Sequence, residues 1–189
     1  MNKTLLALTA AALLGACSGK SSPDASASGS AAAAEPAGNL TEALGDRPDL
    51  STVRAALKDT GIATAFEGKA SYTLLAPTDG AFAKLGESGK ALMQEEDRAA
   101  LAQVLRDHTL PGTVTLDDIN AAVNGAKDGI ARMPSLGSGA VSFSRSGTDL
   151  VVTGPDGTSW RIDGRTVLAT NGVIIPIDTV LKGGAAAPK

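Results

Sequence analysis

The chain is poor in the residues that carry most metal and redox chemistry. Its 189 residues include one cysteine, Cys17, one histidine, His108, and only 3% aromatic residues. A single cysteine excludes an internal disulfide framework, a four-cysteine zinc site and an iron–sulfur cluster, and a single histidine excludes the multi-histidine metal sites. A basic excess is also missing, because the formal net charge is −3. We therefore expect no cofactor and no nucleic-acid partner.

The first apolar run is too short to cross a membrane. It extends from Leu5 to Leu14, about half of the roughly 20 residues that a bilayer-spanning helix needs. Lys3 precedes it and small residues follow, which is typical of a secretory signal. The residues at its end, Leu14-Gly15-Ala16-Cys17, resemble the lipobox of bacterial lipoproteins, in which the cysteine becomes diacylated. This resemblance predicts a signal peptide over 1–16 and lipid attachment at Cys17, whose acyl chains would hold the protein in a bilayer. The alternative is an ordinary signal peptide with a cysteine by chance.

The segments on either side of the central region have compositions that cannot form a core. Residues 18–38 are Ser, Ala, Gly and Pro rich and contain no Leu, Ile, Val or aromatic residue, so 17–38 is interpreted as a lipidated cysteine and a flexible tether. Residues 183–189 are interpreted as a disordered tail, which leaves a domain over 39–182. Ser18, in place of the aspartate that retains many lipoproteins in the inner membrane, favours the outer membrane, at its periplasmic or surface face.

Helical patterns come before strand patterns in this domain. Leu50, Val53 and Leu57 share one face of a predicted helix that Asp49 or Ser51 would cap. Further helices are predicted through Ile62–Phe66, after the N-cap candidates Thr78 and Asp79, over 93–108, and after the cap Thr115 with Asp118 three residues on. A strand is predicted over 71–77, and after Gly125 six short β-type runs are separated by Gly, Asp-Gly and Asn-Gly signals. Helices in one block and strands in another indicate an α+β fold.

Two segments carry a family resemblance. YTLLAPTDGAFAKL, at 72–85, resembles the first signature of fasciclin-like domains, and ATNGVIIPIDTVL, at 169–181, is similar to the second. Between them, VLRDHTLPG lies where family members carry a Tyr-His pair and a Pro-Gly turn. The resemblance implies N-terminal helices packed on a seven-stranded antiparallel β-wedge or sandwich. It also implies a surface module for adhesion and binding, without a catalytic centre.

The family motif residues that this chain retains are expected to have mainly structural roles. They are Thr73, Ala76, Pro77, Thr78, Asp79, Phe82, His108, Pro111, Gly112, Asn171, Gly172, Ile174 and Asp178.

Two departures limit what the resemblance implies. Asp107 stands where the family often has the tyrosine beside the histidine, so the integrin binding linked to that region in animal relatives is not carried over. Ile175-Pro176 replaces the common His-Val of the second signature. Because proline has no backbone N–H, the strand that contains Pro176 is predicted to be an edge strand or to be bulged there.

Three hypotheses for function follow. The main one is a non-enzymatic, lipid-anchored envelope protein whose domain mediates adhesion or extracellular binding to a protein or polysaccharide. The second is a periplasmic or surface protein that binds polysaccharide or peptidoglycan, which an exposed Trp160 or Tyr72 would favour. The third, a hydrolase, requires Asp79 or Asp107 beside His108 with a free serine in a cleft. We expect His108 instead to be a core histidine that is bonded to a backbone carbonyl or to Asp79.

Overall fold

The computed structural model describes residues 38–162 and 165–180. Predictions for the signal peptide, Cys17, the tether and the C-terminal tail lie outside the described residues. Within the described ranges, no helix combines the length and the apolar character that crossing a membrane requires.

The helices and 3₁₀ turns fall mostly in the first half of the domain. They are α1 (Leu40–Gly45), η1 (Pro48–Leu50), α2 (Ser51–Asp59), η2 (Ile62–Glu67), α3 (Asp79–Lys84), α4 (Glu87–Leu92), η3 (Glu95–Asp97), α5 (Arg98–Asp107) and α6 (Leu116–Gly125). The strands are β1 (Tyr72–Pro77), β2 (Thr109–Pro111), β3 (Ala131–Pro134), β4 (Ala140–Ser146), β5 (Asp149–Thr153), β6 (Ser159–Arg161), β7 (Val167–Ala169) and β8 (Gly172–Ile177).

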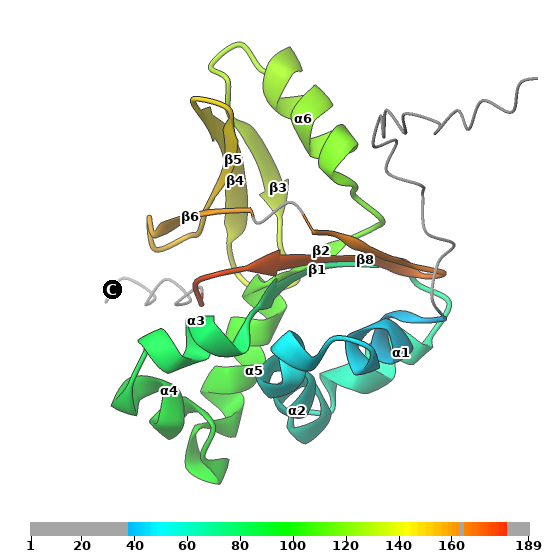
Figure 1. Ribbon diagram of the computed structural model, residues 1–189, viewed down its shortest axis with the longest axis vertical. Coiled ribbons are helices and arrows are strands. Elements are labelled where there is room, and N and C mark those ends of the chain that lie inside the picture. The colour runs from blue at the N-terminus through cyan, green and yellow to red at the C-terminus, as the bar shows by residue number, and fades with distance from the viewer. Residues whose placement is uncertain (1–37, 163–164, 181–189) are drawn as a thin grey trace, which may run out of the picture. The chain divides into compact units, whose positions relative to one another are not determined.

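The strands form two four-stranded sheets. Sheet A has the order β2-β1-β8-β7, and sheet B has the order β3-β4-β5-β6. Helices α1–α5 lie on one side of sheet A, and sheet B with α6 lies on the other (Figure 1). The predicted α+β class with N-terminal helices is confirmed, but the described residues contain eight strands and not seven. One pairing is also parallel, β1 with β8, and residues 78–171, about two thirds of the domain, form the crossover between these two strands.

Sheet A is buried on both faces, which explains the continuous apolar sequences of its two central strands. Alternate residues such as Leu74 and Ile174 pack into a core with the helices, whereas Leu75 and Ile175 pack into a second core with sheet B and α6. All four side chains are fully buried. The signature strands therefore hold the two cores together.

Two of the predicted helix caps are made by residues next to the helix, and a third is not. Thr78 caps α3 by accepting a hydrogen bond from the Ala81 amide, and Thr115 forms a capping box with Asp118 at α6, both as predicted. The cap predicted for α2 is wrong. The turn η1 runs directly into α2, so Leu50 occupies the N-cap position and neither Asp49 nor Ser51 provides a cap from its side chain.

The expectation for Pro176 is only partly met. β8 is a central strand, between β1 and β7, and not an edge strand. β7 pairs with β8 only through Ile174, however, whereas β1 pairs with it as far as Ile177. The Tyr72 amide donates to the Asn171 carbonyl and the Thr78 amide donates to the Ile177 carbonyl. The backbone groups of the odd-numbered residues of β8 therefore point toward β1, and those of the even-numbered residues point toward β7. The nitrogen of Pro176 therefore faces the side on which β7 has already ended, and no ladder bond is lost.

Candidate functional site

The two signature segments lie side by side in sheet A. β1 and β8 pair in register from Tyr72 opposite Gly172 to Pro77 opposite Ile177. Ala76 and Ile174 are fully buried on the helical side of this pair, and Pro77 is buried at its end. Segments about 100 residues apart in the chain thus form one continuous structural unit.

Thr73 fixes the turn that follows β2. Its hydroxyl donates to the Gly112 carbonyl at 2.8 Å and accepts a hydrogen bond from the Val114 amide at 2.7 Å. The Gly112 amide in turn donates to the Ser71 carbonyl, and Pro111 is exposed at the end of β2. The Pro-Gly segment is therefore anchored to β1 from both sides.

Asn171 joins the start of α1 and the end of η2 to the β7–β8 turn. Its side-chain oxygen accepts a hydrogen bond from the Leu40 amide at 2.8 Å, at the start of α1, and its side-chain nitrogen donates to the carbonyls of Phe66 and Gly68. The adjacent Gly172 is needed for close approach, because a Cβ there would lie 1.9 Å from the Tyr72 carbonyl oxygen. We call these contacts the Asn171 clamp.

Asp79 supplies the cap that α2 lacks locally. Its carboxylate accepts hydrogen bonds from the Ser51 hydroxyl and the Thr52 amide, both at 2.7 Å. Partial burial raises the pKa of Asp79, but these hydrogen bonds outweigh that effect and hold the pKa below its usual range. Phe82, on the next turn of α3, is 7% exposed and belongs to the helical core.

His108 is fully buried at the C-terminal end of α5. Its Nδ1 lies 2.8 Å from the Val104 carbonyl oxygen, so of the two expected partners the backbone carbonyl is the one found. Desolvation lowers the pKa of His108 from 6.5 to about 4, although the Val104 carbonyl and the charge of Asp156 oppose the shift. The imidazole is therefore neutral at pH 7.

The two aspartates that a hydrolase site at this histidine would use are bonded to other groups in the described part of the chain. The buried Asp107 carboxylate accepts hydrogen bonds from the Gln103 side chain and from the Ser138 backbone amide. Asp79 is bound to the start of α2, as above. These bonds hold both aspartates to groups other than the imidazole, and His108 lines none of the three cavities described below.

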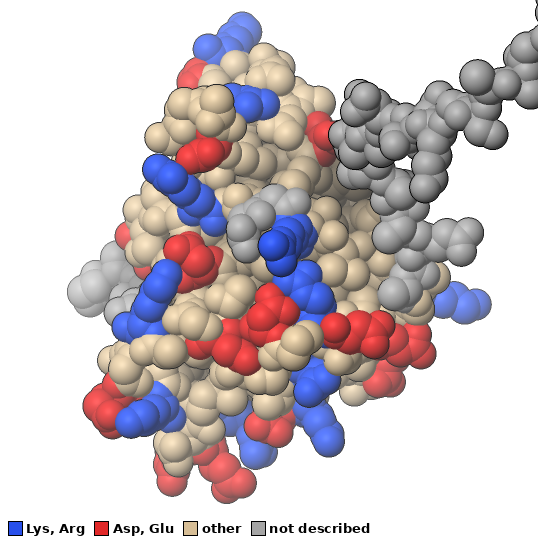
Figure 2. Space-filling view, viewed as in Figure 1, with Lys and Arg blue, Asp and Glu red and all other residues tan. Residues whose placement is uncertain are grey.

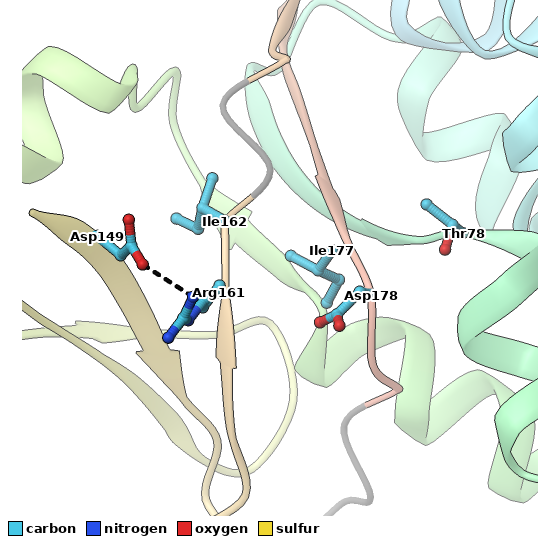
Figure 3. A pocket seen from close by; sticks show the side chains of 6 residues that line it. All are labelled: Thr78, Asp149, Arg161, Ile162, Ile177 and Asp178. Carbon is cyan, nitrogen blue, oxygen red and sulfur yellow. Dashed lines mark ion pairs between the residues drawn. The ribbon is translucent and has the colours of Figure 1, made fainter. Parts of the chain in front are cut away.

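A cavity of about 340 Å³ lies where the two sheets meet. Thr78, Asp149, Arg161, Ile162, Ile177 and Asp178 line it (Figure 3). Ile162 and Ile177 form a β-bridge between the sheets, and Arg161 pairs with Asp149 at 3.0 Å. Asp178 pairs with Lys84 of α3 at 3.0 Å. This junction cavity has an apolar floor and a rim of ion-paired side chains, and Figure 2 shows charges of both signs interleaved across the middle of this face.

A larger hollow of about 630 Å³ lies on the outer side of the helical layer. We call it the helical-face groove; it is lined by Thr52, Asp79, Phe82, Ala83, Gly86, Gly89, Lys90, Met93 and Gln94. A smaller hollow of about 140 Å³, lined by Asp59, Met93, Gln94, Glu95, Arg98 and Leu101, adjoins it. Met93 and Gln94 line both.

Neither Trp160 nor Tyr72, whose exposure would favour a polysaccharide site, is fully exposed. Trp160 is 4% exposed in the core of sheet B, and Tyr72 is half-buried with its ring centroid 5.4 Å from that of Phe66. Among residues 38–162 and 165–180, no group of three or more His, Cys, Asp or Glu side chains is placed to hold a metal ion.

Two features that shape this surface are missing from the sequence-based predictions, α4 and the short strand β2. The sequence of α4, ESGKAL, has a glycine in its interior, which disfavours a helix. The structure explains that glycine, because a Cβ on Gly89 would lie 2.7 Å from the Phe82 carbonyl oxygen. The reason for this glycine is therefore the close packing of α4 on α3, which the sequence alone does not reveal.

Comparison with known proteins agrees with the resemblance of the two signatures. A fasciclin domain family model matches residues 48–183. The chain is 30% identical over 144 residues to the pig (Sus scrofa) transforming growth factor-beta-induced protein ig-h3, a match that covers 76% of this chain but only 19% of the pig protein. It is 28% identical over 153 residues to Protein sll1483 of Synechocystis sp., with 80% of this chain and 77% of that protein covered.

A solved structure has the same fold. A FAS1 domain pair from the insect cell adhesion molecule fasciclin I superposes with a TM-score of 0.65 at 17% identity. The match covers 77% of this chain and 51% of the insect chain, so the chain corresponds to about half of that pair.

Proposed function

The chain belongs to the fasciclin domain family, and from that premise we propose that it is a lipid-anchored module of a bacterial cell envelope that acts in adhesion or extracellular binding. Fasciclin domains are typically non-enzymatic and are associated with adhesion. The observation that carries the proposal is the order of parts in the sequence: an apolar leader, a lipobox-like Leu14–Cys17, a low-complexity segment and then the fasciclin domain.

The start of the domain supports an anchor on its N-terminal side. Asn39 caps α1, and the carbonyl of Gly38 accepts hydrogen bonds from the amide and the hydroxyl of Thr170. The first described residues are thus fixed to the β7–β8 turn. The 21 residues from Ser18 to Gly38, with a coil length of about 25 Å, would let the domain stand away from a lipid surface.

The role of the signature residues supports binding without catalysis. Thr73, Asp79, His108 and Asn171 all make hydrogen bonds to the backbone of the domain itself. Side chains used in this way stabilise the fold and are not free to transfer protons or attack a substrate. We propose that partner binding uses surface features of the domain and does not need the hydrogen-bonding groups of these four residues.

Metabolic labelling with an alkyne-bearing palmitate tests the anchor. We expect the wild-type protein to incorporate the label and to fractionate with membranes, and the Cys17→Ser variant to do neither. Retention of that variant in the membrane fraction, with the domain folded, would contradict lipid attachment at Cys17.

Protease shaving of intact cells tests where the domain is displayed. Surface display predicts that added protease releases a fragment that begins within residues 18–38. Complete protection in intact cells, combined with cleavage after the outer membrane is opened, would exclude adhesion to other surfaces and would leave a periplasmic role.

A further inference from the structure

The helical-face groove combines a buried aromatic residue with adaptable apolar side chains. Its apolar lining includes Phe82, which is 7% exposed, Ala83 on α3 and Met93 after α4. Methionine is flexible and polarisable, and it recurs at surfaces that accept apolar side chains of different shapes. A hollow of about 630 Å³ with this lining suits one or two large apolar side chains of a partner better than a charged small molecule.

The polar groups at the rim are already bonded within the domain. Asp79 accepts hydrogen bonds at the start of α2, Lys90 pairs with Glu87 at 2.7 Å, and Gln94 donates to the Lys90 carbonyl. An incoming apolar group therefore does not leave a rim donor or acceptor without a partner.

The charge around the two hollows is negative. Their two lining cations, Lys90 and Arg98, are each paired with an acidic side chain. Asp59 of α2 and the neighbours Glu96 and Asp97 of η3 are exposed and form no ion pair within the described part of the chain. Lys58, next to Asp59, is exposed and also forms no ion pair among the described residues. Three uncompensated carboxylates against one uncompensated lysine leave the rim net negative, which complements a partner that carries basic residues.

The α4 side of the groove belongs to a different part of the helical layer from α1, the first element of the described domain. α1, which follows Gly38, packs against α2, η2 and sheet A, whereas α4 packs against α3 and α5 (Figure 1). If the chain is anchored as proposed above, we expect α4 to be accessible to an approaching partner.

We propose that the helical-face groove docks a basic amphipathic helix of a partner protein. Its apolar side chains would enter between α3 and α4 over Phe82, and its lysine or arginine side chains would lie along Asp59, Glu96 and Asp97. This is the helix-in-groove mode of peptide recognition.

Methyl NMR of the full chain provides a site-specific test. The chain has three methionines, Met1, Met93 and Met133, of which Met93 lines the groove and Met133 lies on β3 of sheet B. The probe is a synthetic amphipathic helix of leucine and lysine, about 18 residues long, enough to present five turns. Its two comparators carry glutamate in place of lysine, or the same composition in an order without an apolar face. We expect the lysine helix to shift the methyl signal of Met93 and to leave that of Met133 unchanged, and both comparators to shift neither.

Matched variants provide the second test. Ala83→Arg narrows the groove, and Ala121→Arg makes the same change on an exposed position of α6. By anisotropy with the labelled lysine helix, we expect Ala83→Arg to weaken binding by about tenfold or more, and Ala121→Arg to stay within about twofold. Glu96→Gln with Asp97→Asn should weaken binding at low salt and have little effect at high salt.

Each contrary outcome overturns the docking site alone. The proposal is wrong if neither methyl signal shifts, if Met133 shifts as much as Met93, if the glutamate helix binds as well, or if the two arginine variants weaken binding equally. Palmitate labelling and protease shaving do not depend on the groove, so they would still decide the proposed function. If Ala83→Arg does not fold, the Met93 titration of the wild-type protein still gives the answer.

Discussion

Replacing Asn171 by alanine tests whether the turn of the second signature holds the two halves of the domain together. Asn171 is 8% exposed, and it satisfies the Leu40 amide and the Phe66 carbonyl, which both belong to fully buried residues. A buried donor or acceptor that loses its partner costs about 1–3 kcal/mol. Two such groups predict a loss of about 3 kcal/mol in the free energy of unfolding, or about 10 °C in Tm for a domain of this size.

Urea denaturation followed by circular dichroism provides the measurement. Asn120→Ala is the matched control, because Asn120 is half-buried on α6 and its side chain accepts one hydrogen bond, from Arg145. We expect the control to lose at most about 1 kcal/mol. Equal losses in the two variants would refute the reasoning, because the clamp would then be worth no more than a surface contact.

Asn171→Asp separates the two halves of the clamp. The carboxylate keeps an acceptor for the Leu40 amide but cannot donate to the Phe66 carbonyl, so at pH 7 it places two acceptors against each other. Protonation restores a donor. The destabilisation relative to wild type should therefore shrink as the pH falls toward 4, and a difference that stays constant with pH would contradict this account.

Three further predictions concern single positions. Gly172→Ala should cost about 3 kcal/mol or more, or prevent folding, because its Cβ would meet the Tyr72 carbonyl. Gly125→Ala is the control: a Cβ there would have no atom within 4 Å, so its thermal unfolding should be nearly that of the wild type. Equal effects of the two substitutions would contradict the close approach at Gly172. The pKa of His108 is lowered to about 4, so its contribution to stability is fully present above pH 6.5. About 3 kcal/mol of that contribution is lost as the pH falls to about 4. If the urea midpoint of His108→Gln falls with pH as much as that of the wild type over this range, His108 is not the cause of the loss. Asp79→Ala should lower the stability by about 1–2 kcal/mol through loss of the α2 cap, and an unchanged Tm would show that the cap is dispensable.

The features that were predictable from the sequence are those whose causes are local. Thr78 and Thr115 cap helices within three residues of themselves, and the six β-type runs after Gly125 all form strands, β3 to β8. Alternation and turn residues act over a few positions, so one segment of sequence contains the whole signal. The burial of His108 was predictable in the same way, from the apolar face that it shares with Leu101 and Leu105.

The features that were not predictable depend on residues far apart in the chain. Asp79 caps a helix that begins 28 residues before it, and Asn171 bonds to Leu40, 131 residues away. The Asn-Gly pair predicted the break before the last β-type run, and Gly172 is the first residue of β8, opposite Ala169, but the need for glycine there was not visible. The requirement for glycine comes from the parallel pairing with β1, and a single sequence does not reveal which strand will be its neighbour.

The use of the signatures by the fold has a consequence for specificity in the family. In this chain, hydrogen-bonding residues of both signatures are bound to the domain's own backbone, so they can remain the same in proteins that bind different partners. Differences in binding then have to come from surface segments outside the signatures, and α4 with η3 is one such segment. It follows the first signature, α4 lines the helical-face groove, and η3 lines the smaller hollow that adjoins it. Exchanging residues 86–97 between family members should therefore change which partner binds while it leaves the β1–β8 pair, and with it the fold, in place.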